Sequence, residues 1–273
     1  MTAIATRQPV ATAGRVRLAD AVRMEWLKLK TLRSSRWLAL ITVAGVIGIG
    51  LAVLTYYPGH YAHMNAASKA SFDPTNQGFT GMVLGQLTAG IAGVLMMTSE
   101  FSSGSIRATL AAVPRRRMLL AAKALVLAVT VLLIGEVTGL ITFLIGQYVV
   151  LQSVPVHASL AQAAPLRAVL MIGAYLPLMA LLGLGLGAMI RHTAGAISAL
   201  VGLVFALTTI FAVLPASILH AYGRYLPMVI AENSLSAVKP DPYSLSPWAG
   251  FLLLCGYVAA ALLGAAWLSR RDA

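Results

Sequence analysis

Six long apolar runs dominate this sequence and restrict what the chain can fold into. A helix needs about twenty such residues to cross the hydrocarbon core of a bilayer, where every backbone polar group must find a partner within the chain. The sequence therefore predicts an all-α, polytopic membrane protein with six transmembrane helices. The expected spans are Trp37–Tyr56, Gly81–Thr98, Leu119–Leu151, Leu166–Ile190, Ala194–Leu219 and Trp248–Leu268.

Composition supports a single membrane domain. Of the 273 residues, 59% are hydrophobic and only 10% are charged, whereas about 25% of the residues in a soluble domain are charged. No polar stretch is large enough to fold by itself. We expect a flexible N-terminal tail over residues 1–17 and one transmembrane domain over residues 18–273.

The basic residues indicate lipid rather than nucleic acid as a partner. The chain carries a formal net charge of +12, but its Lys and Arg residues lie beside the apolar runs. They are not interleaved with aromatic residues in the way that allows a protein to stack bases. We therefore expect contact with anionic lipid headgroups and no nucleic-acid partner.

The distribution of Lys and Arg also predicts the orientation. Sixteen of them fall in the N-terminal segment and in alternate loops on one side, and four fall on the other side. Loops rich in Lys and Arg remain in the cytoplasm. We expect a multi-pass protein of the cell membrane with both termini in the cytoplasm. An even number of spans independently requires the two termini to share a side.

A helix is expected before the first span, lying in the membrane interface. Arg23 and Lys30 point away from its apolar face, and Trp26 flanks that face at headgroup depth. A solvated basic tail is the alternative. The apolar face consists of Leu18, Val22, Leu29 and Leu32.

Two further segments are neither spans nor simple loops. After the second span, Ile106, Leu110 and Val113 recur at helical spacing and Pro114 marks a stop, which predicts a short cytoplasmic helix. This helix suits docking onto another protein, or it is a lipid-facing turn. Before the last span, Tyr225–Ile230 is apolar but too short to span, which favours a re-entrant or interfacial segment.

Small residues recur one helical turn apart in two of the spans. Gly183 and Gly187 form one such pair, and Ala44 and Gly48 form another. Each pair permits close approach of a neighbouring helix. We interpret them as internal packing sites, with a subunit interface as the alternative.

Three stretches carry a family resemblance. They are Met24–Arg36 before the first span, Glu100–Lys123 after the second, and Arg224–Pro227 before the last. The middle stretch, which begins Glu100-Phe-Ser-Ser-Gly-Ser-Ile-Arg107, is the most specific. In these stretches, and in the order and spacing of its spans, the chain resembles the ABC-2 type permeases, the membrane subunits of ATP-binding-cassette exporters.

The resemblance implies partners and a contact site. A separate ATPase subunit would bind ATP and Mg, and a second permease copy or a paralogue would complete the transporter. A coupling helix beginning near Glu100 would rest on the ATPase subunit, and the N-terminal helix would lie against the same partner. The residues implied at this contact are Glu25, Glu100, Gly104, Arg107, Pro114, Arg115 and Arg116.

The residues themselves agree that ATP is hydrolysed elsewhere. A P-loop needs a lysine directly after a glycine to hold phosphates, and none of the five lysines follows a glycine. We expect no catalytic residues and no cofactor in this chain. The histidines are scattered, whereas a metal site needs three or four convergent ligands, so no metal site is expected.

Polar and aromatic residues within the spans are the candidates for a translocation path. Glu136 lies near the middle of the third span, where an ionised carboxylate is costly. It is protonated, hydrogen-bonded to another helix, or exposed to a wet path. Phe205, Thr208 and Phe211 in the fifth span suit a cavity for amphipathic molecules, or plain packing. Weaker candidates on the second span are Gln86 and Thr88.

These observations favour an exporter permease that moves a drug, peptide, lipid or other amphipathic molecule out of the cell. Two alternatives remain open, namely a secondary transporter driven by an ion gradient and a membrane sensor or scaffold that transports nothing.

Overall fold

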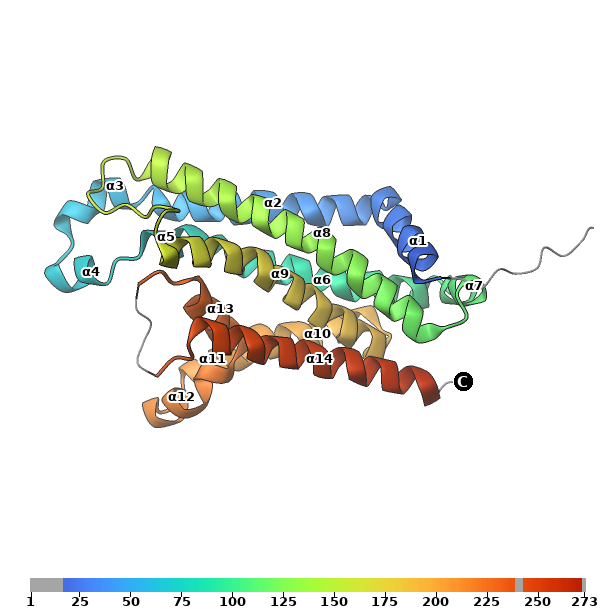
Figure 1. The fold of residues 1–273 in the computed structure, drawn as a ribbon. Helices are drawn as coiled ribbons and strands as arrows, with labels where there is room; N and C mark the ends of the chain where they lie inside the picture. Colours follow the sequence, from blue (N-terminus) through green and yellow to red (C-terminus); the bar gives the residue numbers. More distant parts are fainter. Residues whose placement is uncertain (1–16, 239–242, 272–273) are drawn as a thin grey trace, which may run out of the picture.

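The structure is a computed structural model that describes residues 17–238 and 243–271, and all the regular secondary structure in these ranges is helical (Figure 1). Six helical stretches in these ranges are long and apolar enough to cross a membrane, which confirms the predicted all-α, polytopic architecture. The predicted N-terminal tail, except for Arg17, and the last two residues lie outside the described residues.

Most predicted spans agree with the structure to within a few residues. Two of the helices contain π-helical segments: α8 continues into η3, and α10 is joined to α11 through η4. The spanning elements are α2 (Arg33–Leu54), α6 (Met82–Ser102), α8 (Arg116–Ile145), η3 (Gly146–Val150), α9 (Ala163–Ile190), α10 (Thr193–Val201), η4 (Gly202–Ala206), α11 (Leu207–Ala212) and α14 (Pro247–Arg271).

Shorter helices connect the spans. The predicted N-terminal helix and the predicted helix after the second span are both present, as α1 and α7. These connecting elements are α1 (Leu18–Thr31), α3 (Tyr57–His60), η1 (Tyr61–His63), α4 (Ala66–Ala70), α5 (Pro74–Gly78), η2 (Phe79–Gly81), α7 (Ile106–Ala112), α12 (Ala216–Tyr222), η5 (Gly223–Tyr225) and α13 (Pro227–Leu235).

The fifth span is shorter than the sequence predicted. It ends at Ala212 instead of Leu219, because Pro215 has no backbone N–H with which to continue the helix, and α12 begins directly after it. Of the expected short segment Tyr225–Ile230 before the last span, Tyr225 ends η5 and the residues from Pro227 onwards form the start of α13. Its residues Ile230 and Ala231 are buried, and the helix packs on α9 and α14.

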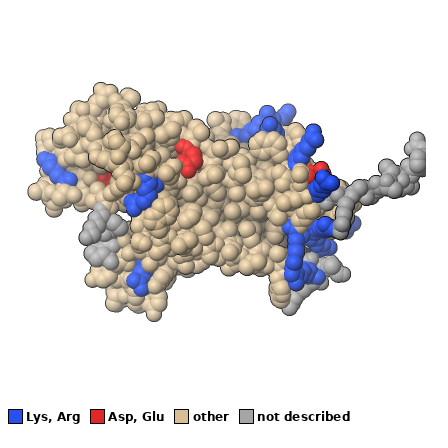
Figure 2. Space-filling view, in the orientation of Figure 1, with Lys and Arg blue, Asp and Glu red and all other residues tan. Residues whose placement is uncertain are grey.

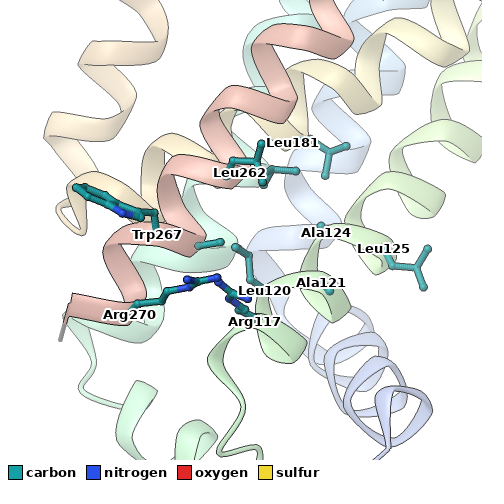
Figure 3. Close-up of a pocket in the computed structure, with 11 residues that line it drawn as sticks. Arg117, Leu120, Ala121, Ala124, Leu125, Leu181, Leu262, Trp267 and Arg270 are labelled. Carbon is teal, nitrogen blue, oxygen red and sulfur yellow. The ribbon is translucent and has the colours of Figure 1, made fainter. Parts of the chain in front are cut away.

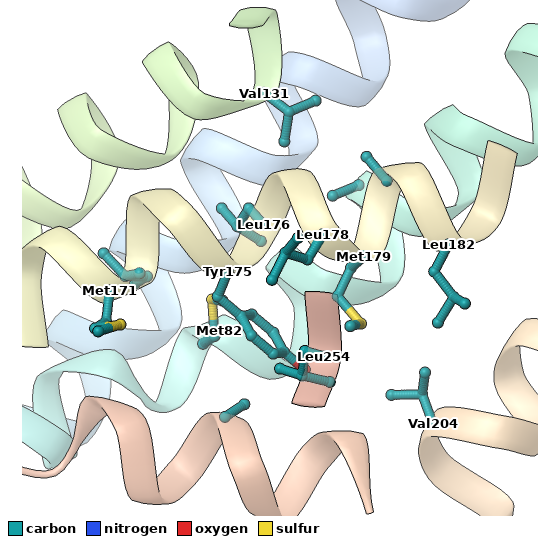
Figure 4. Close-up of a cluster of buried hydrophobic side chains, with 14 of the residues drawn as sticks. Met82, Val131, Met171, Tyr175, Leu176, Leu178, Met179, Leu182, Val204 and Leu254 are labelled. Carbon is teal, nitrogen blue, oxygen red and sulfur yellow. The ribbon is translucent and has the colours of Figure 1, made fainter. Parts of the chain in front are cut away.

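Helix α9 is at the centre of the bundle. It contacts α6, α8, α10 and α14, and it is the most deeply buried of the six spans. Figure 4 shows its side chains Tyr175, Leu176 and Met179 within the main apolar core, together with Met82 of α6 and Leu254 of α14. Four of the other spans therefore pack on a helix that has little exposed surface, and α2 packs on α6 and α8.

Helices α6 and α9 touch backbone to backbone. A Cβ atom added at Gly93 would overlap the Ala180 carbonyl group, and one added at Gly183 would overlap the Gly90 carbonyl group. Gly187 faces Val94 in the same contact. The pair Gly183 and Gly187 is thus an internal packing site, as expected. A Cβ added at Gly48 would meet nothing within 4 Å, so internal packing was the wrong interpretation there.

A buried carboxylate joins two distant segments at the end of the bundle far from α7. Asp73 caps α5 with one oxygen, which accepts hydrogen bonds from the backbone N–H groups of Thr75 and Asn76. Its other oxygen accepts from the N–H groups of Ala237 at 2.6 Å and Val238 at 2.9 Å. The side chain is only 5% exposed. Asp73 therefore fixes the chain that follows α13 to the connection between the first two spans.

Charged side chains are unevenly distributed along the bundle. Figure 2 shows Lys and Arg gathered at the end where α1, α7 and the last turns of α14 lie, with fewer at the opposite end. Helix α1 begins and helix α14 ends at this same basic end (Figure 1).

Candidate functional site

The candidate site lies at the basic end, where α7 packs against α1 and α8. A small apolar cluster, separate from the main core, joins these three helices. From α7, Ile106 and Leu110 pack against it. Its buried members are Ala21, Val113, Leu119 and Ala122. The short helix is thereby held on the ends of the bundle by its apolar face.

Beside this cluster, four charged side chains form one network. Lys123 Nζ lies 2.9 Å from Glu25 Oε2 and 2.7 Å from Glu100 Oε1. Lys28 Nζ lies 3.0 Å from Glu25 Oε1 and 2.8 Å from Glu100 Oε1. Each lysine contacts both carboxylates. Because the network contains two lysines and two glutamates, its formal charge is zero. It connects α1, the last turn of α6 and the second turn of α8.

Burial makes this network costly to disturb. The side chains of Glu25 and Lys123 are each 1% exposed, and that of Glu100 is 10% exposed. Removing an ion from water costs several kcal/mol, which only close opposite charges and hydrogen bonds repay. Lys28, whose side chain is 33% exposed, covers the network on the solvent side.

Lys28 extends the network to the short helix. Its Nζ also donates a hydrogen bond of 3.2 Å to Thr109 Oγ1 on α7. Burial by itself would lower the pKa of Lys28, but the hydrogen bonds to Glu100 and Glu25 outweigh it and hold the pKa above its ordinary value. Lys28 therefore remains charged at neutral pH.

The family resemblance implied a short helix that begins near Glu100, and the structure corrects this start. Helix α6 continues through Ser102 and α7 starts at Ile106, so Glu100 belongs to the last turn of the second span. The chain changes direction at Gly104, whose φ of 71° lies in the left-handed region that favours glycine. The Glu100 side chain consequently points into the bundle instead of towards a docking partner.

The other residues implied at the ATPase contact lie outside the network. Gly104, Arg107, Pro114 and Arg115 are exposed on α7 and its connections, and Arg116 is half-buried at the start of α8. The structure therefore separates the seven residues into an exposed rim and an internal pair, Glu25 and Glu100. It brings that pair together through the two lysines.

Lys28 and Lys123 were missing from the predicted site. A signal was present, because Lys123 stands among apolar residues at the start of a span and a charge in such a position requires a partner. Glu100, near the end of the preceding span, is the complementary charge. Glu25 and Lys28, three residues apart on one helix, are also neighbours by helical spacing.

The predicted path residues on α6 are buried between helices. Gln86 Oε1 accepts a hydrogen bond of 2.7 Å from the Tyr175 hydroxyl on α9. The hydroxyl of Thr88 is 2.6 Å from that of Thr42 on α2. Gln86 and Thr88 are 3% and 5% exposed. In this conformation they connect α6 to its neighbours.

The remaining path residues do not converge with them. Glu136 is half-buried on α8, with its carboxyl group against Gly173 of α9. Within residues 17–238 and 243–271, no hydrogen bond or ion pair reaches that carboxyl group. Phe205, Thr208 and Phe211 are half-buried on η4 and α11. A role for these residues in translocation stays a prediction.

The fold and this site define a multi-pass membrane protein in which a short surface helix is attached to the spans through buried charges. A profile of the ABC-2 family transporter proteins matches residues 21–205, more than half of the chain. The chain belongs to this family and is an ABC-2 type permease, a membrane component of ABC transporters. The match runs from α1 to η4 and so includes all four charged residues of the network. Comparison with curated proteins gave no match.

Proposed function

We propose that this permease exports an amphipathic molecule across the cell membrane, driven by a separate ABC ATPase subunit that docks on α7. The observation that carries this proposal is the buried network of Glu25, Lys28, Glu100 and Lys123 directly behind α7. A helix that only lies on lipid would not require three charges to be buried behind it, with a fourth covering them.

The charge distribution supports a cytoplasmic position for α7. Sixteen of the twenty Lys and Arg residues belong to the N-terminal segment and to the loops on the side of α7. Such loops remain in the cytoplasm, where ATP is available. Both termini would then be cytoplasmic as well.

The contacts of α7 suggest how a push from the ATPase would reach the spans. Ile106 and Leu110 of α7 pack against the apolar cluster that α1 and α8 share, and Thr109 accepts a hydrogen bond from Lys28. From Lys28 the ion pairs lead to Glu100 on α6 and, through Glu25, to Lys123 on α8. Because pulling one of these helices away would separate buried opposite charges, α1, α6, α7 and α8 would move as a unit.

A complete transporter would contain two ATPase subunits and a second permease half, which is a further copy of this chain or a paralogue. Drugs, peptides and lipids fit the apolar character of the spans. The translocation path would open between the two halves as ATP binding and hydrolysis move α7.

The proposal is tested by isolating the tagged chain from its native membranes. We expect a P-loop ATPase to co-purify and the complex to show vanadate-sensitive ATP hydrolysis. Arg107 is exposed on α7, so Arg107→Glu should cut this activity while leaving membrane insertion intact. Lys69→Glu makes the same charge change at the opposite end of the bundle and serves as the control. Full activity of a correctly inserted Arg107→Glu complex would contradict docking at α7.

A further inference from the structure

A groove opens between α8, α9 and α14 at the basic end of the bundle (Figure 3). Its volume is about 880 Å³, which is within the range of about 300–1,000 Å³ typical of small-molecule sites. It lies on a different face of α8 from the ionic network, because Leu120 and Ala124 line the groove whereas Lys123 is buried in the network.

The groove is apolar along its length and cationic at one end. Nine of its eleven lining residues are apolar, among them Leu181 of α9 and Leu262 of α14. The other two are Arg117 of α8 and Arg270 of α14. In Figure 3 the side chains of these two arginines extend towards one another at the end of the groove.

The cationic end continues beyond the groove. A second cavity of about 460 Å³ adjoins it and shares Arg117 and Arg270. This cavity is also lined by Arg115 and Arg116. Like charges repel at short distance, so the two guanidinium groups of Arg117 and Arg270, which border both spaces, are stabilised by an anion placed between them.

The chemistry of the occupant follows from this division. Arginine binds phosphate through paired N–H donors of fixed geometry. The apolar stretch suits a hydrocarbon chain, and Trp267, a residue type enriched at headgroup depth, also lines the groove. An anionic phospholipid combines both parts in one molecule.

We propose that this groove binds an acyl chain of an anionic phospholipid from the leaflet at the basic end, with the lipid phosphate held between Arg117 and Arg270. The site would connect α8 and α14 from the lipid side. It goes beyond the proposed transport function, because it does not depend on which molecule the permease moves or on which ATPase drives it.

Brominated lipids test this site through Trp267. The full chain is placed in nanodiscs with Trp26, Trp37 and Trp248 replaced by phenylalanine, so that fluorescence reports on the groove. Dibrominated phosphatidylglycerol or dibrominated phosphatidylcholine is then titrated as a minor lipid. We expect phosphatidylglycerol to quench at an about thirtyfold lower mole fraction, given the attraction of two basic residues at the membrane surface.

Variants separate a built site from general surface charge. The double variant Arg117→Gln/Arg270→Gln should abolish the preference for phosphatidylglycerol. The matched control Arg33→Gln/Arg36→Gln removes the same charge at the start of α2 and should retain it. Ala124→Phe, which fills the groove, should reduce quenching by both lipids.

Four results would overturn the proposal. Equal quenching by the two lipids, or a preference that survives loss of both arginines, would exclude recognition of the headgroup. Displacement by soluble glycerol phosphate alone would indicate an anion site without a role for the acyl chain. Protection of Trp267 from both lipids would show that a second protein chain covers the groove.

Discussion

Replacing Lys123 with methionine is expected to lower the free energy of unfolding by about 3–5 kcal/mol, the usual cost of removing one partner from a buried ion pair. The Lys123 side chain is 1% exposed, so solvent screening does not reduce this figure. Methionine is also long and unbranched, and the substitution leaves little empty space. The loss therefore measures the charge and not a cavity.

The size of the effect follows from the charges left behind. Glu25 Oε2 accepts its hydrogen bond from Lys123, and Glu100 Oε1 is shared between Lys123 and Lys28. Without Lys123, two carboxylates share one ammonium group in a site that is almost closed to water. One unit of negative charge is then left uncompensated.

The assay is reversible unfolding in mixed micelles with increasing SDS, followed by circular dichroism. Arg23→Met removes an exposed charge from α1 and should change stability by no more than about 0.5 kcal/mol. Adding Glu100→Gln to Lys123→Met should restore part of the loss, because it removes the uncompensated carboxylate. If Lys123→Met costs no more than Arg23→Met, or if the two network substitutions are simply additive, the network does not stabilise the fold as described.

Two further predictions concern other parts of the bundle. Gly93→Ala should destabilise the protein by about 1–3 kcal/mol in the same assay, because the new Cβ would overlap α9; Gly48→Ala, which meets nothing within 4 Å, should cost nothing, and equal effects would refute the close α6–α9 contact. Asp73→Asn should weaken the hydrogen bonds that hold the chain after α13, and hydrogen-exchange mass spectrometry should show faster exchange at Ala237, with α8 peptides unchanged. Unaltered exchange at Ala237 would show that Asp73 does not fix this segment.

Much of the fold was readable because each feature depends on residues close together in the chain. Six spans follow from the length of the apolar runs, and the helix at Ile106–Ala112 follows from local spacing and from Pro114. The errors were local as well. Pro215 ends the fifth span early. The turn at Gly104 separates α6 from the short helix, so that Glu100 belongs to α6.

The site was only half predictable. Glu25 and Glu100 stood out in the stretches that carry the family resemblance, but Lys123 lies 98 positions from Glu25 and 23 from Glu100. Separations of this kind carry no periodicity that a reader of the sequence can use. Only the packing of α1 against α8 shows that one ammonium group serves both carboxylates.

The sequence by itself determined that this chain lies in a membrane as six helices, because a backbone without water must satisfy its own hydrogen bonds and an apolar run of that length has no other stable solution. The tertiary structure alone decided which helix is central, which glycines bring backbones together, and which charges are paired. These depend on how the helices are rotated and placed against one another, and that placement is set by contacts between residues far apart in the chain.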